Sequence, residues 1–239
     1  MPNWCENRLS VSGPKETIAK IIVATKVDQC EFDFNGIVPM PPELNITAGS
    51  STSWGEDILY GDWARMLGLP VWRDLFLELT GGLLPETREE MVRLIEYEHR
   101  LYQLSNRLSW SFNLNEARQA KANREKYGFK DWYDWSVANW GIKWNGGQVD
   151  VESMESESFT IYFSTAWSPP VPVIDSLCEQ YSDIEVELSY AETGCWFAGK
   201  VYGSDGVITD SPVDDVKQFC IDEFGHEFED DEAEEEVEA

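Results

Sequence analysis

Strand-like segments stand at both ends of this chain, and a long stretch without them separates the two groups. Residues 4–12 alternate apolar and polar side chains and stop at Gly13-Pro14, as a half-buried strand does. From residue 143 onward the hydrophobic period is again two, whereas residues 55–140 follow the helical period. A single strand cannot bury its apolar face alone. The first strand must therefore pair with strands from the far end of the chain.

The same patterns assign the remaining elements. Residues 15–26 carry Ile18, Ile21 and Ile22 at helical spacing, and three prolines within residues 32–44 favour an extended loop with apolar anchors. Hydrophobic period and turn residues together predict strands at 143–152, 158–167, 184–190 and 195–203, and further helices at 86–105, 108–127, 171–181 and 213–224.

In chain order these elements predict an α+β fold, a ferredoxin-like split β-α-β sandwich with a large helical insertion between the first helix and the second strand. Right-handed crossovers place strand 4–12 beside strand 158–167 in the middle of the sheet. We expect residues 1–50 and 138–224 to form one composite ferredoxin-like domain. Residues 51–137 should form a separate helical insertion, and residues 225–239 an acidic disordered tail.

The charge is large and uneven. The formal net charge is −27, and residues 131–239 contain Lys143, Lys200 and Lys217 as their only Lys or Arg residues. Such a chain repels polyanions, so we expect no direct binding of duplex DNA and no attachment to an anionic membrane. No apolar run of membrane-spanning length and no secretory signal pattern is found, which predicts a cytoplasmic protein.

Cysteine and histidine, the residue types of nucleophilic catalysis and zinc binding, are few. The five cysteines form no CxxC pair, and the two histidines, His99 and His226, are far apart in sequence. Phosphate-binding loops, nucleophile elbows and zinc-protease motifs are also absent from the sequence. We therefore predict no catalytic residues, no metal and no cofactor, and favour a non-enzymatic protein.

Five separated segments resemble the YubB-like family of plasmid and phage proteins. They are residues 1–9 (MPNWCENRL), 32–41 (FDFNGIVPMP), 140–145 (WGIKWN), 163–170 (FSTAWSPP) and 190–194 (YAETG). The resemblance spans most of the chain outside residues 50–130 and the acidic tail. It implies a ferredoxin-like C-terminal domain and residence on a mobile genetic element, and it carries over no catalytic residues.

Polar residues at the strand ends allow two interpretations. They could form a small-ligand or catalytic pocket, or they could form a satisfied polar network that fixes the end of the sheet. The candidate pocket residues are Asn3, Glu6, Asn7, Arg8, Lys143 and Asn145, with Thr165 and Ser168 from the next strand. Spacing alone does not distinguish the two interpretations.

Aromatic residues concentrate between Tyr127 and Trp144, and Trp167 and Trp196 follow later. In sheets of this topology, exposed aromatics can stack the bases of single-stranded nucleic acid. Core packing is the other interpretation. The sequence favours packing, because single-strand binding also needs a basic groove and the second half of the chain has few cations.

The acidic second half is the preferred candidate for function. A strongly negative surface can imitate a nucleic-acid backbone and occupy a basic cleft, with fast and salt-sensitive binding. The candidate partner-binding residues are Asp183, Glu185, Glu187, Glu229, Asp230, Asp231 and Glu232. We predict a host protein as the partner, basic and nucleic-acid-handling, bound by a nucleic-acid mimic or anti-defence inhibitor. A generic solubilising role for these acids is the alternative.

Overall fold

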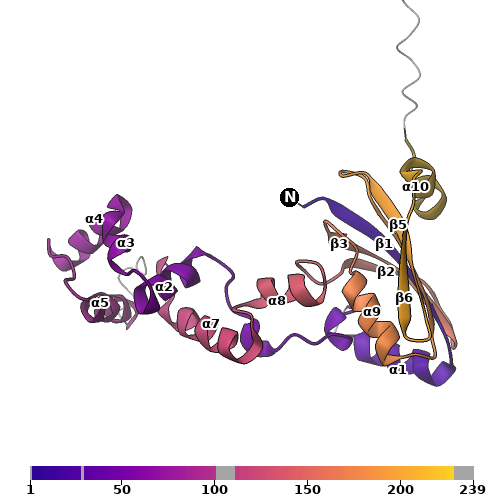
Figure 1. Ribbon diagram of the computed structural model, residues 1–239, viewed down its shortest axis with the longest axis horizontal. Helices are drawn as coiled ribbons and strands as arrows, with labels where there is room; N and C mark the ends of the chain where they lie inside the picture. Colours follow the sequence, from indigo (N-terminus) through magenta and orange to yellow (C-terminus); the bar gives the residue numbers. More distant parts are fainter. Residues whose placement is uncertain (1, 28–29, 101–110, 229–239) are drawn as a thin grey trace, which may run out of the picture. The chain divides into compact units, whose positions relative to one another are not determined.

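The computed structural model describes residues 2–27, 30–100 and 111–228. The chain divides into two compact units (Figure 1). Unit 1 contains Met1–Pro39 and Ser136–Ala239, and unit 2 is Met40–Trp135. Among the residues described, no helix combines the length and the apolar character needed to cross a membrane.

Unit 1 is built on a six-stranded antiparallel sheet in the order β2-β3-β1-β4-β5-β6. The strands are β1 (Trp4–Ser12), β2 (Gly147–Met154), β3 (Ser158–Ala166), β4 (Glu185–Glu192), β5 (Phe197–Ser204) and β6 (Val207–Pro212). Strand β1 pairs with β3 along its whole length and with β4 on its other side. The predicted central position of the first strand is confirmed.

Two helices, α1 (Lys15–Thr25) and α9 (Val171–Gln180), supply the helical layer of this sandwich. Alternate β1 residues, such as Leu9, are fully buried, and Ile18 of α1 and Leu177 of α9 are buried with them. Burying one such side chain stabilises the fold by about 1.5–3 kcal/mol. The order β1-α1-β2-β3-α9-β4 and the strand order confirm the α+β, ferredoxin-like fold class, with a helical insertion between α1 and β2.

The structure adds β6, which the sequence pattern did not predict. Asp205 and Gly206 have positive φ angles of 52° and 77°, the backbone of a two-residue hairpin turn. This turn returns the chain along β5. The following segment contains an aspartate and a proline and has no apolar alternation, so periodicity gave no strand signal.

The loop after α1 is held by aromatic anchors. It contains two short 3-10 helices, Phe34–Gly36 and Pro42–Leu44, and Phe32 and Phe34 are completely buried against each other and Phe163. The Asn145 side chain accepts the Phe34 N–H at 3.0 Å and donates to Asp33 at 2.7 Å. These bonds explain why β2 begins at Gly147 and not at residue 143, since Asn145 is committed to the loop.

Unit 2 is helical in the residues that the structure describes. Its helices are α2 (Ser50–Tyr60), α3 (Ala64–Gly68), α4 (Pro70–Thr80), α5 (Arg88–Arg100) and α7 (Leu114–Tyr127), and α8 (Trp132–Asn139) crosses the boundary to unit 1. The helix predicted at 86–105 matches α5 as far as residue 100. Residues 101–105 and 108–110 of the two predicted helices lie outside the described residues. Helix α7 begins at Leu114, where the side chain of Asn113 caps it by accepting the Glu116 N–H.

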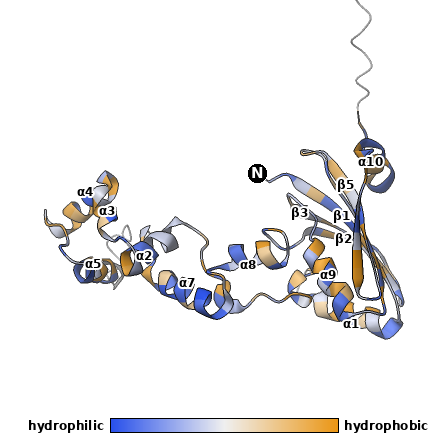
Figure 2. Ribbon diagram, in the orientation of Figure 1, coloured by the Kyte–Doolittle hydropathy of each residue, from blue (hydrophilic) through white to orange (hydrophobic). Residues whose placement is uncertain are grey.

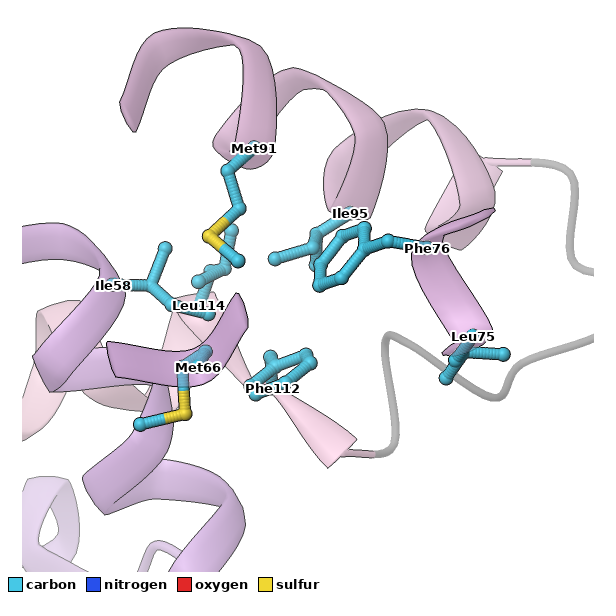
Figure 3. Close-up of a cluster of buried hydrophobic side chains, with 8 residues drawn as sticks. All are labelled: Ile58, Met66, Leu75, Phe76, Met91, Ile95, Phe112 and Leu114. Atoms are coloured by element: carbon cyan, nitrogen blue, oxygen red, sulfur yellow. The ribbon is translucent and has the colours of Figure 1, made fainter. Parts of the chain in front are cut away.

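The core of unit 2 joins residues from α2 to α7. Figure 3 shows Phe76, Met91 and Ile95 pointing into one space between α4 and α5, and all three are essentially inaccessible to solvent. The full cluster is Ile58, Met66, Leu75, Phe76, Met91, Ile95, Phe112 and Leu114. Helix α7 is largely hydrophilic along its length (Figure 2) and contributes Leu114 and two alanines to the buried side.

Gly36 makes the closest backbone approach of the loop, and its substitution should destabilise unit 1. A Cβ at this position would lie 2.2 Å from the Ala24 carbonyl oxygen, and backbone cannot move aside as a side chain can. We expect Gly36→Ala to lower the free energy of unfolding by about 3 kcal/mol, measured by urea denaturation with circular dichroism. Gly68→Ala is the matched control, because nothing lies within 4 Å of that Cβ. Equal stability of the two variants would contradict the assigned packing.

Candidate functional site

The sheet of unit 1 has two chemically different faces. Cys5, Asn7 and Leu9 of β1 are buried on the helix side, whereas the alternate residues Glu6 and Arg8 are partly accessible on the other side. We call this second side the open face. Helix α10 (Val216–Phe224) covers one end of it by packing against Ala191 of β4 and Ala198 of β5. Among the described residues, side chains such as Asp150 and Glu185 remain exposed on the rest of the open face.

Carboxylates dominate the open face. Strand alternation and register place on it, from the strands and from α10, the side chains of Glu6, Asp150, Glu152, Glu185, Glu187 and Glu223. The only Lys or Arg residues within the six strands are Arg8 and Lys200. We call this set of carboxylates the acidic face.

Both strand cations are already neutralised. Arg8 lies 2.9 Å from Glu152, and Lys200 lies 2.7 Å from Glu187 and 2.6 Å from Glu223. Partial burial of Lys200 opposes its charge, but the two carboxylates outweigh this effect and raise its pKa above the ordinary value. In the same way, Lys200 and Ser189 lower the pKa of Glu223 against the effect of burial. Lys200 and Glu223 therefore stabilise each other in their charged forms.

Two grooves lie on the open face. The larger, about 580 Å³, lies at the end away from α10 and is lined by β1, β3, β4, β5 and β6. Its walls carry hydroxyl groups, including those of Ser10, Thr160 and Tyr202, together with the carboxylates of Glu185 and Glu187. The smaller groove, about 430 Å³, lies between β1, β2, β3 and Phe224 of α10.

The segment after α10 folds back toward the sheet. Gly225 adopts a left-handed conformation with a φ of 68°, and His226 Nε2 lies 2.5 Å from Glu6 Oε2. The ring of Phe228 packs 5.7 Å from that of Trp196, between centroids. His226 thus contacts the acidic face at Glu6, and Phe228, the last described residue, packs at the β4–β5 turn. The predicted residues Glu229, Asp230, Asp231 and Glu232 lie outside the described residues.

The structure separates the other predicted acidic residues. Glu185 and Glu187 both line the larger groove on the open face. Asp183 precedes β4 and accepts a hydrogen bond of 2.8 Å from Thr17 Oγ1 of α1, which places it at the helical layer. The three carboxylates are neighbours in sequence but do not share one face.

The predicted pocket residues on the helix side form buried structural bonds. Asn7 Nδ2 donates to Thr165 Oγ1 at 2.9 Å, and Thr165 Oγ1 donates to the Ser168 carbonyl oxygen at 2.7 Å. Asn7 Oδ1 is buried and has no hydrogen-bond partner among the described residues. Asn145 ties the loop after α1 to β2, as described above. These bonds fix strand ends.

The remaining predicted pocket residues point elsewhere. Glu6 and Arg8 lie on the open face, in contact with His226 and Glu152 respectively. Lys143 Nζ lies 4.3 Å from the ring centroid of Trp144. Asn3 Nδ2 lies 3.6 Å from Cys195 Sγ at the β4–β5 turn. The structure thus distributes the candidate pocket over both sheet faces and one sheet end.

Three tryptophans gather at the end of the sheet where β1 starts. Trp144 lies between Trp4 and Trp167, with ring centroids 6.4 Å and 5.9 Å away. Each indole is between 38% and 51% exposed, so this cluster is not core packing. Trp167 also holds a positive φ of 69°, an unusual conformation for a bulky residue. The buried Trp140, in contrast, packs on Phe34 and donates to the Val38 carbonyl oxygen.

A buried carboxylate organises the neighbouring β4–β5 turn. Glu192 is 2% exposed and accepts the N–H groups of Gly194 and Cys195, both at 2.6 Å. Burial alone would raise its pKa, but these amides, together with Cys195 and Asn3 side chains, lower it below the ordinary value. The turn is therefore fixed by an ionised glutamate.

Sequence reasoning missed Lys200, Glu223 and His226 as parts of this surface. Period-two alternation could have placed Lys200 on the polar side of its strand. The partners of Glu223 and His226 depend on how α10 docks, for which the sequence carries no local signal. Among the described residues, no group of three or more His, Cys, Asp and Glu side chains is arranged to hold a metal ion.

A family model supports the ferredoxin-like fold of the C-terminal part. Residues 139–238 match the family model described as the ferredoxin-like domain in Api92-like protein. A crystal structure of a protein api92 from Yersinia pseudotuberculosis aligns over 90% of this chain and 99% of that chain, with 13% sequence identity and a TM-score of 0.40. No curated protein matches the chain. The C-terminal part of this chain is therefore similar to the ferredoxin-like domain of Api92-like proteins.

Removing the charge of Glu192 should destabilise the protein in a pH-dependent way. The lowered pKa means that its stabilising effect is complete above the unfolded value of 4.5 and is lost as the pH falls through the folded value. We expect Glu192→Gln to cost about 2 kcal/mol at pH 7, and the difference from the unsubstituted protein to shrink below pH 4.5. Urea denaturation at several pH values measures this. Glu179→Gln on the exposed side of α9 is the control, and an identical pH profile for both variants would refute the assignment.

The cysteines should differ strongly in reactivity. Cys195 is exposed, whereas burial raises the pKa of the Cys5 thiol to about 12 and that of Cys178 to about 11. Iodoacetamide should therefore modify Cys195 before either of these two thiols, which should react only on unfolding. Peptide mass spectrometry over time gives the order, and Cys195→Ser should abolish that early modification. Early labelling of Cys5 would be inconsistent with the buried β1.

Proposed function

We propose that this chain is a non-enzymatic binding protein that uses its acidic face to hold a basic protein. One observation carries the proposal: both cations of the strands are neutralised within the open face, while Asp150 and Glu185 remain exposed there. A surface of this kind attracts a partner rich in Lys and Arg and accelerates the encounter. The acidic residues after Phe228 extend the same charge.

A protein partner fits this charge better than a nucleic acid does. Single-strand binding needs a basic groove beside stacking aromatics. Each groove of the open face contains two carboxylates, and neither is lined by a Lys or Arg residue. The protein surface most complementary to the acidic face is a basic cleft that normally binds a nucleic-acid backbone. We therefore favour a basic, nucleic-acid-handling protein as the partner and mimicry of a polyanion as the mode of action.

The resemblance to YubB-like proteins of plasmids and phages suggests the biological context of this proposal, a mobile genetic element inside a host cell. A protein on a mobile element benefits from blocking host nucleases, restriction enzymes or CRISPR-type complexes, and each of these has a basic cleft. We propose that the chain acts in the cytoplasm as an anti-defence inhibitor of such a host factor.

A second candidate, small-ligand binding, is favoured by the smaller groove. Glu6, Asp150 and Tyr162 line that groove of about 430 Å³ and offer both charged and hydroxyl groups. A rise in melting temperature with a nucleotide or metabolite would support this function.

The charge of the open face can be tested with a double substitution. We expect Asp150→Asn/Glu185→Gln to weaken capture of basic proteins from a bacterial lysate at least about tenfold, equivalent to 1.4 kcal/mol. It should also reduce the salt dependence of that capture, because fewer charges are paired. Immobilised full-length protein at two salt concentrations, with quantitative mass spectrometry, measures both effects.

The matched control removes the same charge from the helical layer. Glu16 of α1 and Glu179 of α9 are exposed, so Glu16→Gln/Glu179→Gln changes the net charge equally without touching the open face. Equal loss in the two double variants would mean that only net charge matters. A chain ending at residue 228 measures the contribution of the tail.

A further inference from the structure

The two edges of the sheet are built differently. Strand β2 pairs with β3 through two register shifts, at Gly147/Asp150 and at Val151/Ser153. Such bulges bend an edge strand and hinder pairing with another chain. Strand β6 pairs with β5 in one continuous register from Ser204–Val207 to Gly199–Pro212, without a bulge. The regular, accessible edge is therefore β6.

Hairpin geometry shows which backbone groups point outward along this edge. A two-residue turn closes on a hydrogen-bonded pair, so Val207, Thr209 and Ser211 bond inward to β5. The N–H of Val213 continues this pattern by donating to the Ala198 carbonyl oxygen at 3.0 Å. The N–H and C=O groups of Ile208 and Asp210 consequently face away from β5. No strand of the described residues pairs with them.

The surroundings of this edge are negatively charged. Asp205 precedes β6, Asp210 lies within it, and Asp214 and Asp215 follow it, with no Lys or Arg from 201 to 216. On the open-face side, Val207 and Thr209 line the larger groove, which also contains Glu185. Side chains of an added strand would therefore lie near Asp210 on the helix side of the sheet and near this groove on the open face.

We propose that β6 is the docking edge for an extended, Lys- or Arg-rich segment of the partner, which adds to the sheet as a seventh strand. Backbone bonds to Ile208 and Asp210 provide the register. Alternate basic side chains lie over the carboxylates of the larger groove and beside Asp210. This inference rests on the proposed function, because it specifies how the basic partner is held.

A second copy of this chain is a poorer occupant of the edge. Two chains that each carry a formal charge of −27 repel one another. Pairing of two β6 strands would also bring their Asp210 residues close together, and like charges at close range on neighbouring strands are unfavourable. Charge complementarity thus selects a basic segment.

The test uses full-length protein and a synthetic ten-residue peptide that alternates Lys with Thr and Val. We expect the peptide to bind in a salt-sensitive way and to slow hydrogen exchange at Ile208 and Asp210, measured by NMR. Ile208→Pro removes an outward N–H that β5 does not use, so the hairpin should survive. Its matched control, Ile208→Ala, loses the side chain but retains the N–H. The proline variant should bind at least about tenfold more weakly than the alanine variant.

The outcomes separate this inference from the proposed function. If both Ile208 variants bind the peptide equally while Asp150→Asn/Glu185→Gln binds weakly, the acidic face stands and strand addition is overturned. Two results would support strand addition at β6 but overturn the choice of a basic partner. One is peptide binding that does not depend on salt and that only Ile208→Pro abolishes. The other is a peptide with Glu in place of Lys that binds as tightly as the Lys peptide. Self-association through β6, seen by sedimentation, would identify a second copy as the occupant. Should Ile208→Pro unfold, protection of the two amides in the unsubstituted protein decides the question, and no protection overturns the proposal.

Discussion

The pairing of β1 between β3 and β4 is the constraint on which the rest of unit 1 depends. The strand comes from the first residues of the chain, and both of its neighbours lie more than 140 residues later. Without β1 the sheet would separate into the β2–β3 hairpin and the β4–β5–β6 group, and an isolated two-stranded hairpin is at best marginally stable. The long-range closure explains why helices α2 to α8 can occupy the middle of the chain. They connect two halves of one sheet and do not interrupt it.

The period of the central strand determines the chemistry of both faces. Odd-numbered β1 residues build the core beneath α1 and α9, and even-numbered residues place Glu6 and Arg8 on the open face. Because register transmits this alternation to each neighbouring strand, the carboxylates of β2, β4 and α10 meet on one surface although they are scattered in sequence. The acidic face is thus a product of strand pairing and of the composition of the second half together.

Local periodicity was sufficient to predict most of the fold but not the partners of individual side chains. Alternation and turn residues located β1, β3, β4, β5 and the helices α1 and α9, and the order of these elements led to the ferredoxin-like arrangement. Strand β6 was missed because its apolar residues Val207 and Ile208 are adjacent and do not alternate with polar ones, and because its aspartate and proline disfavour a strand. Asn145 was interpreted as a possible pocket residue, whereas its bonds to the loop after α1 arise only when distant segments meet.

The ion pairs of the open face also explain how so acidic a surface stays folded. Mutual repulsion of carboxylates favours expansion of the chain. This repulsion would be strongest where α10 places Glu223 close to Glu187 of the sheet. Lys200 lies between these two carboxylates and joins the helix to the sheet. Burial of Cys220 and Val216 against the alanines of β4 and β5 supplies the apolar part of the same contact. The cations are therefore placed where folding requires them, which leaves the outer carboxylates of β2 and β4 uncompensated toward solvent. A surface that uses its few cations internally can be neutralised only from outside, and the basic partner proposed above would supply that charge.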